Sequence, residues 1–145
     1  MNKKLIAILV FLAIVSAGCV SVVWASEKVN VDGIDFNVPD GFKEDKTQET
    51  IKQSETSGSV TYLKTTKAYE NSTTAVVFMV AEYQGVEVTD EVVASTGGEQ
   101  KTINNVTGYQ NTDGQFTTFA FEKDGKLAVV STNDASLLDV VLVGN

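Results

Sequence analysis

An uncharged apolar run from Leu5 to Ala25 follows Lys3 and Lys4, and it constrains this 145-residue chain more than any other feature. A basic start, an apolar stretch and a polar continuation, here Ser26-Glu27-Lys28, are typical of an export signal. A helix packed on the core of a small soluble domain would show a polar face, and this run has none. We therefore expect residues 26–145 to form an exported part of the protein.

Three forms of this N-terminal segment fit the sequence. Val23 and Ala25 are small residues at the two positions that a signal peptidase inspects, so cleavage after Ala25 is one form. Ser16-Ala17-Gly18-Cys19 resembles a lipobox and would make Cys19 a lipidation site, although Ser16 stands where a branched apolar residue is usual. An uncleaved helix of 21 residues would reach roughly 30 Å at ~1.5 Å per residue and would anchor the chain in a membrane. The positive-inside rule then places the domain outside, so all three forms export it.

The exported part is acidic. The chain has eleven basic residues, all of them lysines, and no histidine. Without Lys3 and Lys4, nine lysines remain against nineteen acids, which gives residues 26–145 a net charge of −10. Nucleic acids and anionic membrane surfaces attract clustered lysine and arginine, so neither is an expected partner of this domain.

The missing residue types exclude several kinds of catalytic site. Without histidine the chain cannot form a Ser-His-Asp triad, and Cys19 is its only cysteine, so residues 26–145 have neither a thiol nucleophile nor a disulfide. A glycosidase needs only two carboxylates, which keeps an acidic hydrolase as a third hypothesis. We expect a protein that is not an enzyme and that carries no cofactor.

One stretch is similar to a calcium loop. Asn111-Thr112-Asp113-Gly114 supplies three of its positions, but Tyr109 and Ala120 stand where the first acid and the bidentate glutamate belong. The preference of Asx-Gly for tight turns explains the stretch better, so we predict no metal site.

Two sequons offer sites for N-linked glycosylation in an exported chain, at Asn71 (Asn71-Ser72-Thr73) and at Asn105 (Asn105-Val106-Thr107). Both fall at expected turns or strand edges. Chance sequons are common in a chain rich in Asn and Thr, so their occupancy is open.

Turn signals predict three β-hairpins. Asp32-Gly33 would join two strands within residues 29–38, and Asn104-Asn105 would pair Ile103 with Val106. Asp124-Gly125 would join residues 116–123 to 126–132, with apolar side chains on both faces. A sheet that is apolar on both faces implies cover on both sides.

The remaining segments are of mixed type. Residues 59–66 and 73–83 read as strands, the second of them central, because Ala75 to Ala81 is unbroken apolar. Thr89 would cap a short helix that ends at Gly97 and Gly98. Residues 43–59 are polar and read as a loop or a surface helix, whereas an apolar stripe over residues 137–141, capped by Asn133 or Asp134, reads as a closing helix.

Together these elements predict residues 1–25 as signal or anchor and residues 26–145 as a single α+β domain, a mainly antiparallel sheet built from hairpins with helices packed on it. The order of elements and the run Phe36-Asn37-Val38-Pro39-Asp40-Gly41-Phe42 resemble the PsbP-like fold and small exported lipoprotein-like proteins of methanogenic archaea. That resemblance implies accessory or assembly roles at membranes and no shared catalytic residues.

The sequence therefore favours an exported, membrane-attached domain that binds an unknown envelope protein and catalyses no reaction. The alternative is a carrier of a small ligand or a metal ion, with a pocket between the sheet and its helices. A large exposed apolar patch would favour the first hypothesis, and an enclosed cavity with converging polar groups would favour the second.

Overall fold

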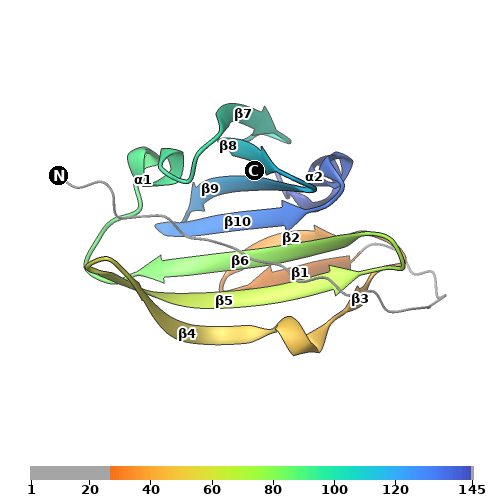
Figure 1. Ribbon diagram of the computed structural model, residues 1–145, viewed down its shortest axis with the longest axis horizontal. Coiled ribbons are helices and arrows are strands. Elements are labelled where there is room, and N and C mark those ends of the chain that lie inside the picture. Colours follow the sequence, from red (N-terminus) through yellow and green to blue (C-terminus); the bar gives the residue numbers. More distant parts are fainter. Residues whose placement is uncertain (1–26, 145) are drawn as a thin grey trace.

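A computed structural model describes residues 27–144 of the chain. Most of it is one twisted antiparallel sheet with a separate hairpin packed against it (Figure 1). The strands are β1 (Glu27–Val31), β2 (Ile34–Val38), β3 (Lys43–Glu44), β4 (Thr50–Ser57), β5 (Val60–Glu70), β6 (Ala75–Tyr83), β7 (Glu99–Ile103), β8 (Val106–Asp113), β9 (Phe116–Lys123) and β10 (Lys126–Thr132). The helices are η1 (Lys46–Gln48), α1 (Asp90–Ala94), η2 (Ala135–Leu137) and α2 (Leu138–Val141).

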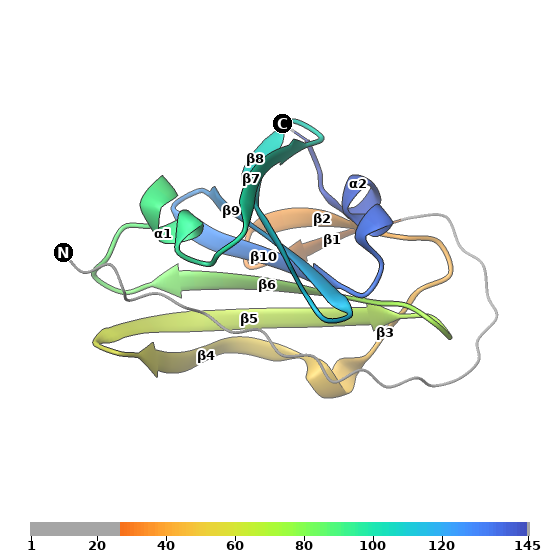
Figure 2. The same ribbon diagram turned by 45° about the horizontal axis from the view of Figure 1, so that its top comes forward.

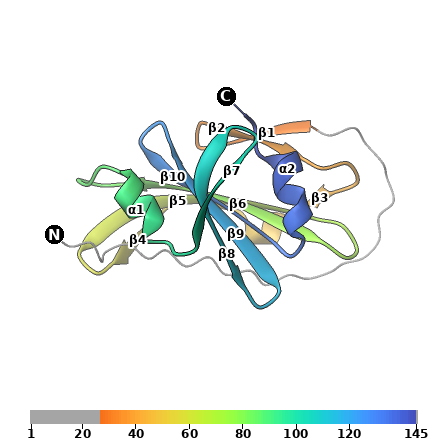
Figure 3. The same ribbon diagram turned by 90° about the horizontal axis from the view of Figure 1, so that it is seen from above.

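The large sheet has the order β3-β5-β6-β10-β9-β8-β7, and β4 also pairs with β5. The strands twist so far along this order that β8 and β9 cross the direction of β5 and β6 when the molecule is seen from above (Figure 3). The β1–β2 hairpin forms a second, two-stranded sheet. It lies with α2 over one face of the large sheet, whereas α1 lies near the other face (Figures 1 and 2).

The prediction of an α+β fold is wrong, because the chain is mostly antiparallel β-sheet. Strands hold 58% of the described residues and helices 13%, with only two short α-helices. The apolar stripe at the C-terminal end forms one 3-10 turn and one α-helical turn, in η2 and α2. Elements this short close the ends of the core and cannot form a layer of their own.

The expectation for residues 43–59 is also wrong, because this segment forms β3, η1 and the long edge strand β4. The side chains of β4 are largely exposed on both faces, so the segment lacks the alternation that marks a half-buried strand. A tight turn at Gly58 and Ser59 joins it to β5, where Ser57 pairs with Val60. Pairing with β5, rather than burial, therefore makes this segment a strand.

The predicted hairpins are confirmed in their registers. Val31 pairs with Ile34, Ile103 with Val106, and Lys123 with Lys126. Both residues of each two-residue turn have positive φ, as the turn type requires. The second residue is glycine in two of the turns and Asn105 in the third. The predicted central strand is confirmed as β6, which pairs with β5 on one side and β10 on the other.

Each face of the large sheet carries its own apolar core. Under the hairpin and α2, Phe36 stacks on Phe78 with ring centroids 4.5 Å apart. On the opposite face a smaller cluster contains Met79, Leu127 and Val93, the last from α1. The predicted cover on both faces is thus present, and β6 and β10 are buried because they lie between the two clusters.

Candidate functional site

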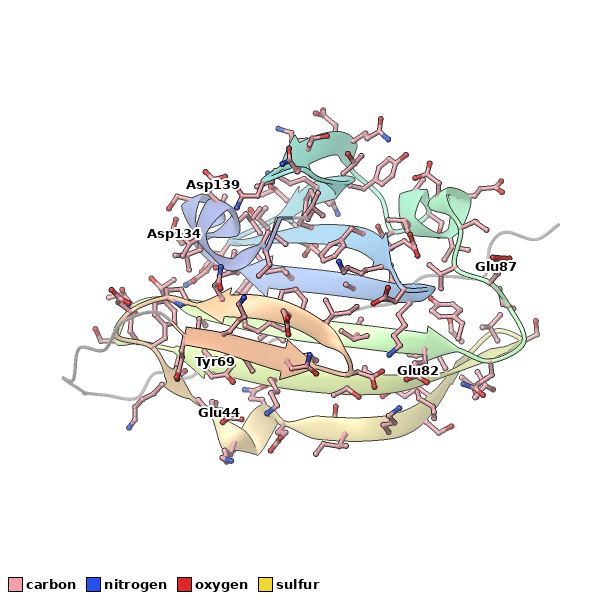
Figure 4. All side chains as sticks on the ribbon, turned by 180° about the vertical axis from the view of Figure 1, so that it is seen from behind. Glu44, Tyr69, Glu82, Glu87, Asp134 and Asp139 are labelled. Atoms are coloured by element: carbon pink, nitrogen blue, oxygen red, sulfur yellow. The ribbon has the colours of Figure 1, made fainter. Side chains whose placement is uncertain are left out.

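Four charged side chains gather where the turn of the β1–β2 hairpin meets the large sheet. Asp32 comes from that turn, Glu82 from the end of β6, Lys126 from the start of β10 and Lys52 from β4. Figure 4 labels Glu82 on β6, near the hairpin turn. We call these four residues the hairpin ion cluster.

A break in β4 aims Lys52 at this cluster. The pairing of β4 with β5 shifts between Thr50 and Gln53, and Lys52 within the shift has a φ of 49°. The Lys52 amide donates to Oγ1 of Thr65 at 3.1 Å, which holds the irregular backbone in place. A bulge of this kind redirects a side chain, here across the end of the sheet.

The charges of the cluster alternate in sign. Lys52 Nζ lies 3.1 Å from Oδ1 of Asp32 and 2.8 Å from Oε2 of Glu82. Lys126 Nζ lies 3.5 Å from Oδ2 of Asp32 and 3.6 Å from Oε2 of Glu82, and it donates to the Asp32 carbonyl oxygen at 2.6 Å. The Asp32 side chain is only 8% exposed, and its Oδ2 has no hydrogen-bond partner besides this ion-pair contact.

Each carboxylate of the cluster is paired with lysine, and this arrangement does not favour proton transfer. Side-chain hydrogen bonding with Asp32, followed by the hydrogen bond that Lys52 donates, lowers the pKa of Glu82 to about 2. Hydrogen bonds to Glu82 and Asp32 in turn raise the pKa of Lys52. A general acid at neutral pH needs a carboxyl group with a raised pKa, and Glu82 is shifted the other way. The geometry fits a cross-link between four chain segments.

The second feature is a cleft of about 190 Å³ on the other side of the hairpin turn. Its apolar part comes from Ile34, Val106, Phe121 and Val143. We call it the rim cleft, and its remaining lining residues are Gly33, Asp35, Asn105, Thr107, Glu122, Lys123 and Gly144.

Two acidic residues, Asp35 and Glu122, are among those that line the rim cleft. Asp35 accepts at Oδ1 from Nδ2 of Asn30 at 2.9 Å, and Glu122 accepts at Oε2 from the Gly125 amide at 2.9 Å. Both residues are exposed, so both carboxylates contact solvent. The cleft thus combines an apolar floor with acidic residues in its lining.

The C-terminal segment forms one wall of the cleft because Asn104 holds it there. Nδ2 of Asn104 donates to the carbonyl oxygens of Asp139 at 2.7 Å and of Leu142 at 3.0 Å. The Asn104-Asn105 turn therefore has two roles, since it joins β7 to β8 and positions the segment that contains Val143 and Gly144.

No part of the chain between residues 27 and 144 groups three or more acidic, cysteine or histidine side chains as a metal site would. The stretch similar to a calcium loop is the β8–β9 hairpin, where Asp113 pairs with Phe116 and Gly114 has a φ of 66°. Tyr109 and Ala120 face each other across that ladder, which confirms the turn interpretation.

The site residues expected from the sequence lie in three different places. Cys19 lies outside the described residues. Asn71 lies in the connection between β5 and β6, and Asn105 lies in the β7–β8 turn at the rim cleft. The sequence offered no signal for the cleft or the ion cluster, because each brings together segments separated by dozens of residues. Asp32 and Lys126, for example, are 94 positions apart.

Exposed apolar side chains do not form a large patch on the described surface. The large ones are Ile51, Val86 and Val140, and they belong to β4, to the connection after β6 and to α2. Within residues 27–144, no helix has the length and apolarity needed to cross a bilayer.

Comparison of the chain with protein-family models, with curated proteins and with solved structures yields no match. The resemblance to the PsbP-like fold therefore stays a prediction.

Proposed function

We propose that this protein is an exported, membrane-attached domain that binds a protein of the cell envelope and catalyses no reaction. The observation that carries the proposal is the rim cleft, which has an apolar floor and the acidic residues Asp35 and Glu122 in its lining. Such a cleft suits one side chain of a partner that has an apolar stem and a cationic head, as lysine and arginine do.

Charge and surface composition favour a basic partner. The exported part carries a net charge of −10, and complementary charge speeds and orients association. The apolar patch that would favour a protein contact is absent from the surface of residues 27–144, where the exposed large apolar residues are single, so the proposed contact rests on the cleft and on charge.

Two observations support the non-catalytic part of the proposal. The carboxylates of Asp32 and Glu82 are each paired with both Lys52 and Lys126. In addition, the lowered pKa of Glu82 keeps it ionised at neutral pH, so it cannot donate a proton there.

A small-ligand carrier is the second candidate, and the same cleft is the observation that favours it. Its volume of about 190 Å³ is smaller than the roughly 300–1,000 Å³ of typical ligand pockets. The cleft also lies between hairpin turns and the C-terminal segment rather than between the sheet and its helices. The size and position of the cleft therefore favour the binding of one side chain of a partner protein over the binding of a small ligand.

The proposal is tested by cross-linking the protein in intact cells, followed by purification and mass spectrometry. We expect one envelope protein in stoichiometric amount, and the recovered N-terminal peptide identifies the form of membrane attachment. The double variant Asp35→Asn/Glu122→Gln should recover about 5-fold less of it, which corresponds to roughly 1 kcal/mol.

The matched control is Asp113→Asn/Glu99→Gln, which removes the same charge from exposed positions outside the cleft. An equal loss in both double variants would show that net charge rather than the cleft governs the contact. Recovery of the protein alone would contradict partner binding, and a small molecule retained in native mass spectrometry would favour the carrier.

A further inference from the structure

The two sequons differ in how the fold holds them. Asn71-Ser72-Thr73 lies entirely in the connection between β5 and β6, and Ser72 and Thr73 are exposed. Asn105-Val106-Thr107 begins in a two-residue turn and continues into β8. An enzyme that must grip three consecutive residues therefore meets a surface loop in one case and a paired strand in the other.

The carboxamide of Asn71 is held in a defined orientation. Its Oδ1 accepts from the Thr74 amide at 2.8 Å, from the Thr73 amide at 3.0 Å and from the Thr73 hydroxyl at 3.4 Å. Among the described residues, none accepts a hydrogen bond from Asn71 Nδ2. Donors on Oδ1 draw electron density from the amide nitrogen and make its protons easier to remove.

The loop that presents Asn71 is itself fixed. Asn133 donates from Nδ2 to the Thr73 carbonyl oxygen at 3.2 Å and accepts at Oδ1 from the Ala75 amide at 2.9 Å. The Asn71 amide donates to the Thr74 carbonyl oxygen at 2.9 Å, which closes the turn. The sequon thus has one defined conformation, in which Asn71 is half-buried and Ser72 and Thr73 are exposed.

The second sequon is held by strand pairing and by its buried middle residue, whereas Asn105 and Thr107 are themselves exposed. Val106 is only 7% exposed and belongs to the core under the hairpin. The Thr107 hydroxyl lies 2.8 Å from that of Thr102, its pairing partner in β7. An enzyme could grip residues 105–107 only after it separated β7 from β8 and withdrew Val106 from the core.

We propose that the folded domain is glycosylated at Asn71 and not at Asn105. The donor is a sugar linked through C1 to a lipid phosphate or pyrophosphate. Asn71 Nδ2 attacks C1 and passes a proton to a base of the transferase, the C1–N bond forms, and the C1–O bond breaks as the lipid phosphate leaves with the electron pair. The registers place Glu70 and Ala75 at one end of the sheet and Lys123 and Lys126 at the other, so the glycan leaves the rim cleft open.

The first test is peptide mapping by mass spectrometry of the native protein, isolated from cells that produce it. We expect glycan on the peptide that contains Asn71 and an unmodified Asn105. An unmodified Asn71, or glycan at Asn105, would overturn the proposal. Thr73→Val should abolish the modification, Thr73→Ser should keep it, and the matched variant Thr107→Val should leave it unchanged.

A second test distinguishes the effect of the sequon sequence from the effect of the folded structure around it. The folded protein and two synthetic peptides, residues 68–76 and 102–110, are offered to a purified oligosaccharyltransferase with its lipid-linked donor. Both peptides should accept glycan, whereas the folded protein should accept it at Asn71 alone, with at least a 10-fold preference over Asn105. Equal modification of both asparagines in the folded protein would show that the fold does not select between them.

Discussion

At the scale of single residues, two stacked tyrosines differ in whether the hydroxyl group has a hydrogen-bond partner. Tyr62 and Tyr83 stack with ring centroids 5.5 Å apart. The Tyr62 hydroxyl donates to Oε1 of Glu55 at 3.2 Å, whereas the Tyr83 hydroxyl is buried without a partner. Burial, followed by the nearby Glu55 charge, raises the pKa of Tyr62 to about 12, and burial likewise raises the pKa of Tyr83.

Because a buried hydroxyl without a partner costs free energy, Tyr83→Phe should stabilise the fold by about 1 kcal/mol. The matched variant Tyr62→Phe removes a satisfied hydrogen bond and should destabilise it by about 0.5–1.5 kcal/mol. Urea unfolding followed by circular dichroism measures both changes. Equal effects of the two variants would contradict this account of the pair.

Glu82 makes the stability of the protein depend on pH. Its pKa is about 2 in the folded state and 4.5 when unperturbed, so ionised Glu82 stabilises the fold above pH 4.5. This contribution falls as the pH is lowered from about 4.5 toward 2. In Glu82→Gln, the free energy of unfolding should therefore change less across this range than in the unchanged protein.

Chemical denaturation at a series of pH values measures the difference between the two proteins. Glu99→Gln, at an exposed position on β7, is the control and should follow the unchanged protein. Parallel pH profiles for the unchanged protein and Glu82→Gln would contradict the role given to the hairpin ion cluster.

At the scale of elements, β8 approaches β9 so closely at Gly108 that no side chain fits. A Cβ atom there would lie 2.2 Å from the Ala120 carbonyl oxygen and 2.9 Å from the Phe119 ring. Gly114, in the turn between the same strands, has open space around it and a φ of 66°. The first glycine is required by packing and the second by backbone conformation.

Gly108→Ala should therefore cost about 3 kcal/mol, because the backbone of β8 must move away from the core. Gly114→Ala should cost only about 1–2 kcal/mol, the strain of alanine in the left-handed region. Denaturant midpoints measure both, and a larger loss for Gly114→Ala would contradict the close approach of β8 to β9.

Elements were predictable from the sequence where turn chemistry or burial leaves a local signal. The Asp32-Gly33 and Asp124-Gly125 turns and the Thr89 cap, whose Oγ1 accepts from the Val92 amide, are such cases. The sequence of β4 carries no such local signal, because β4 is a strand only through its pairing with β5 and most of its side chains are exposed to solvent. The fold class was missed since β4 was read as non-strand and a single helical turn as a full helix.

At the scale of the whole molecule, the sites were not predictable because they arise from contacts distant in the sequence. The rim cleft needs the β1–β2 turn, the β7–β8 turn, the end of β9 and the C-terminal segment to meet. Nothing in the local sequence around Asp35 or Glu122 distinguishes either from the other solvated acids. Two carboxylates without histidine or cysteine carry no motif, so only the fold brings them together.

The central claim is that a partner side chain enters the rim cleft in the cell, and site-specific photo-cross-linking tests it most directly. A photoreactive amino acid replaces Asp35 at the cleft or, as the control, Asp113 in the β8–β9 hairpin, and intact cells are irradiated. The account predicts one cross-linked envelope protein from position 35, attached through a segment that contains lysine or arginine, and none from position 113. The absence of an adduct from position 35, or the same adducts from both positions, would contradict it.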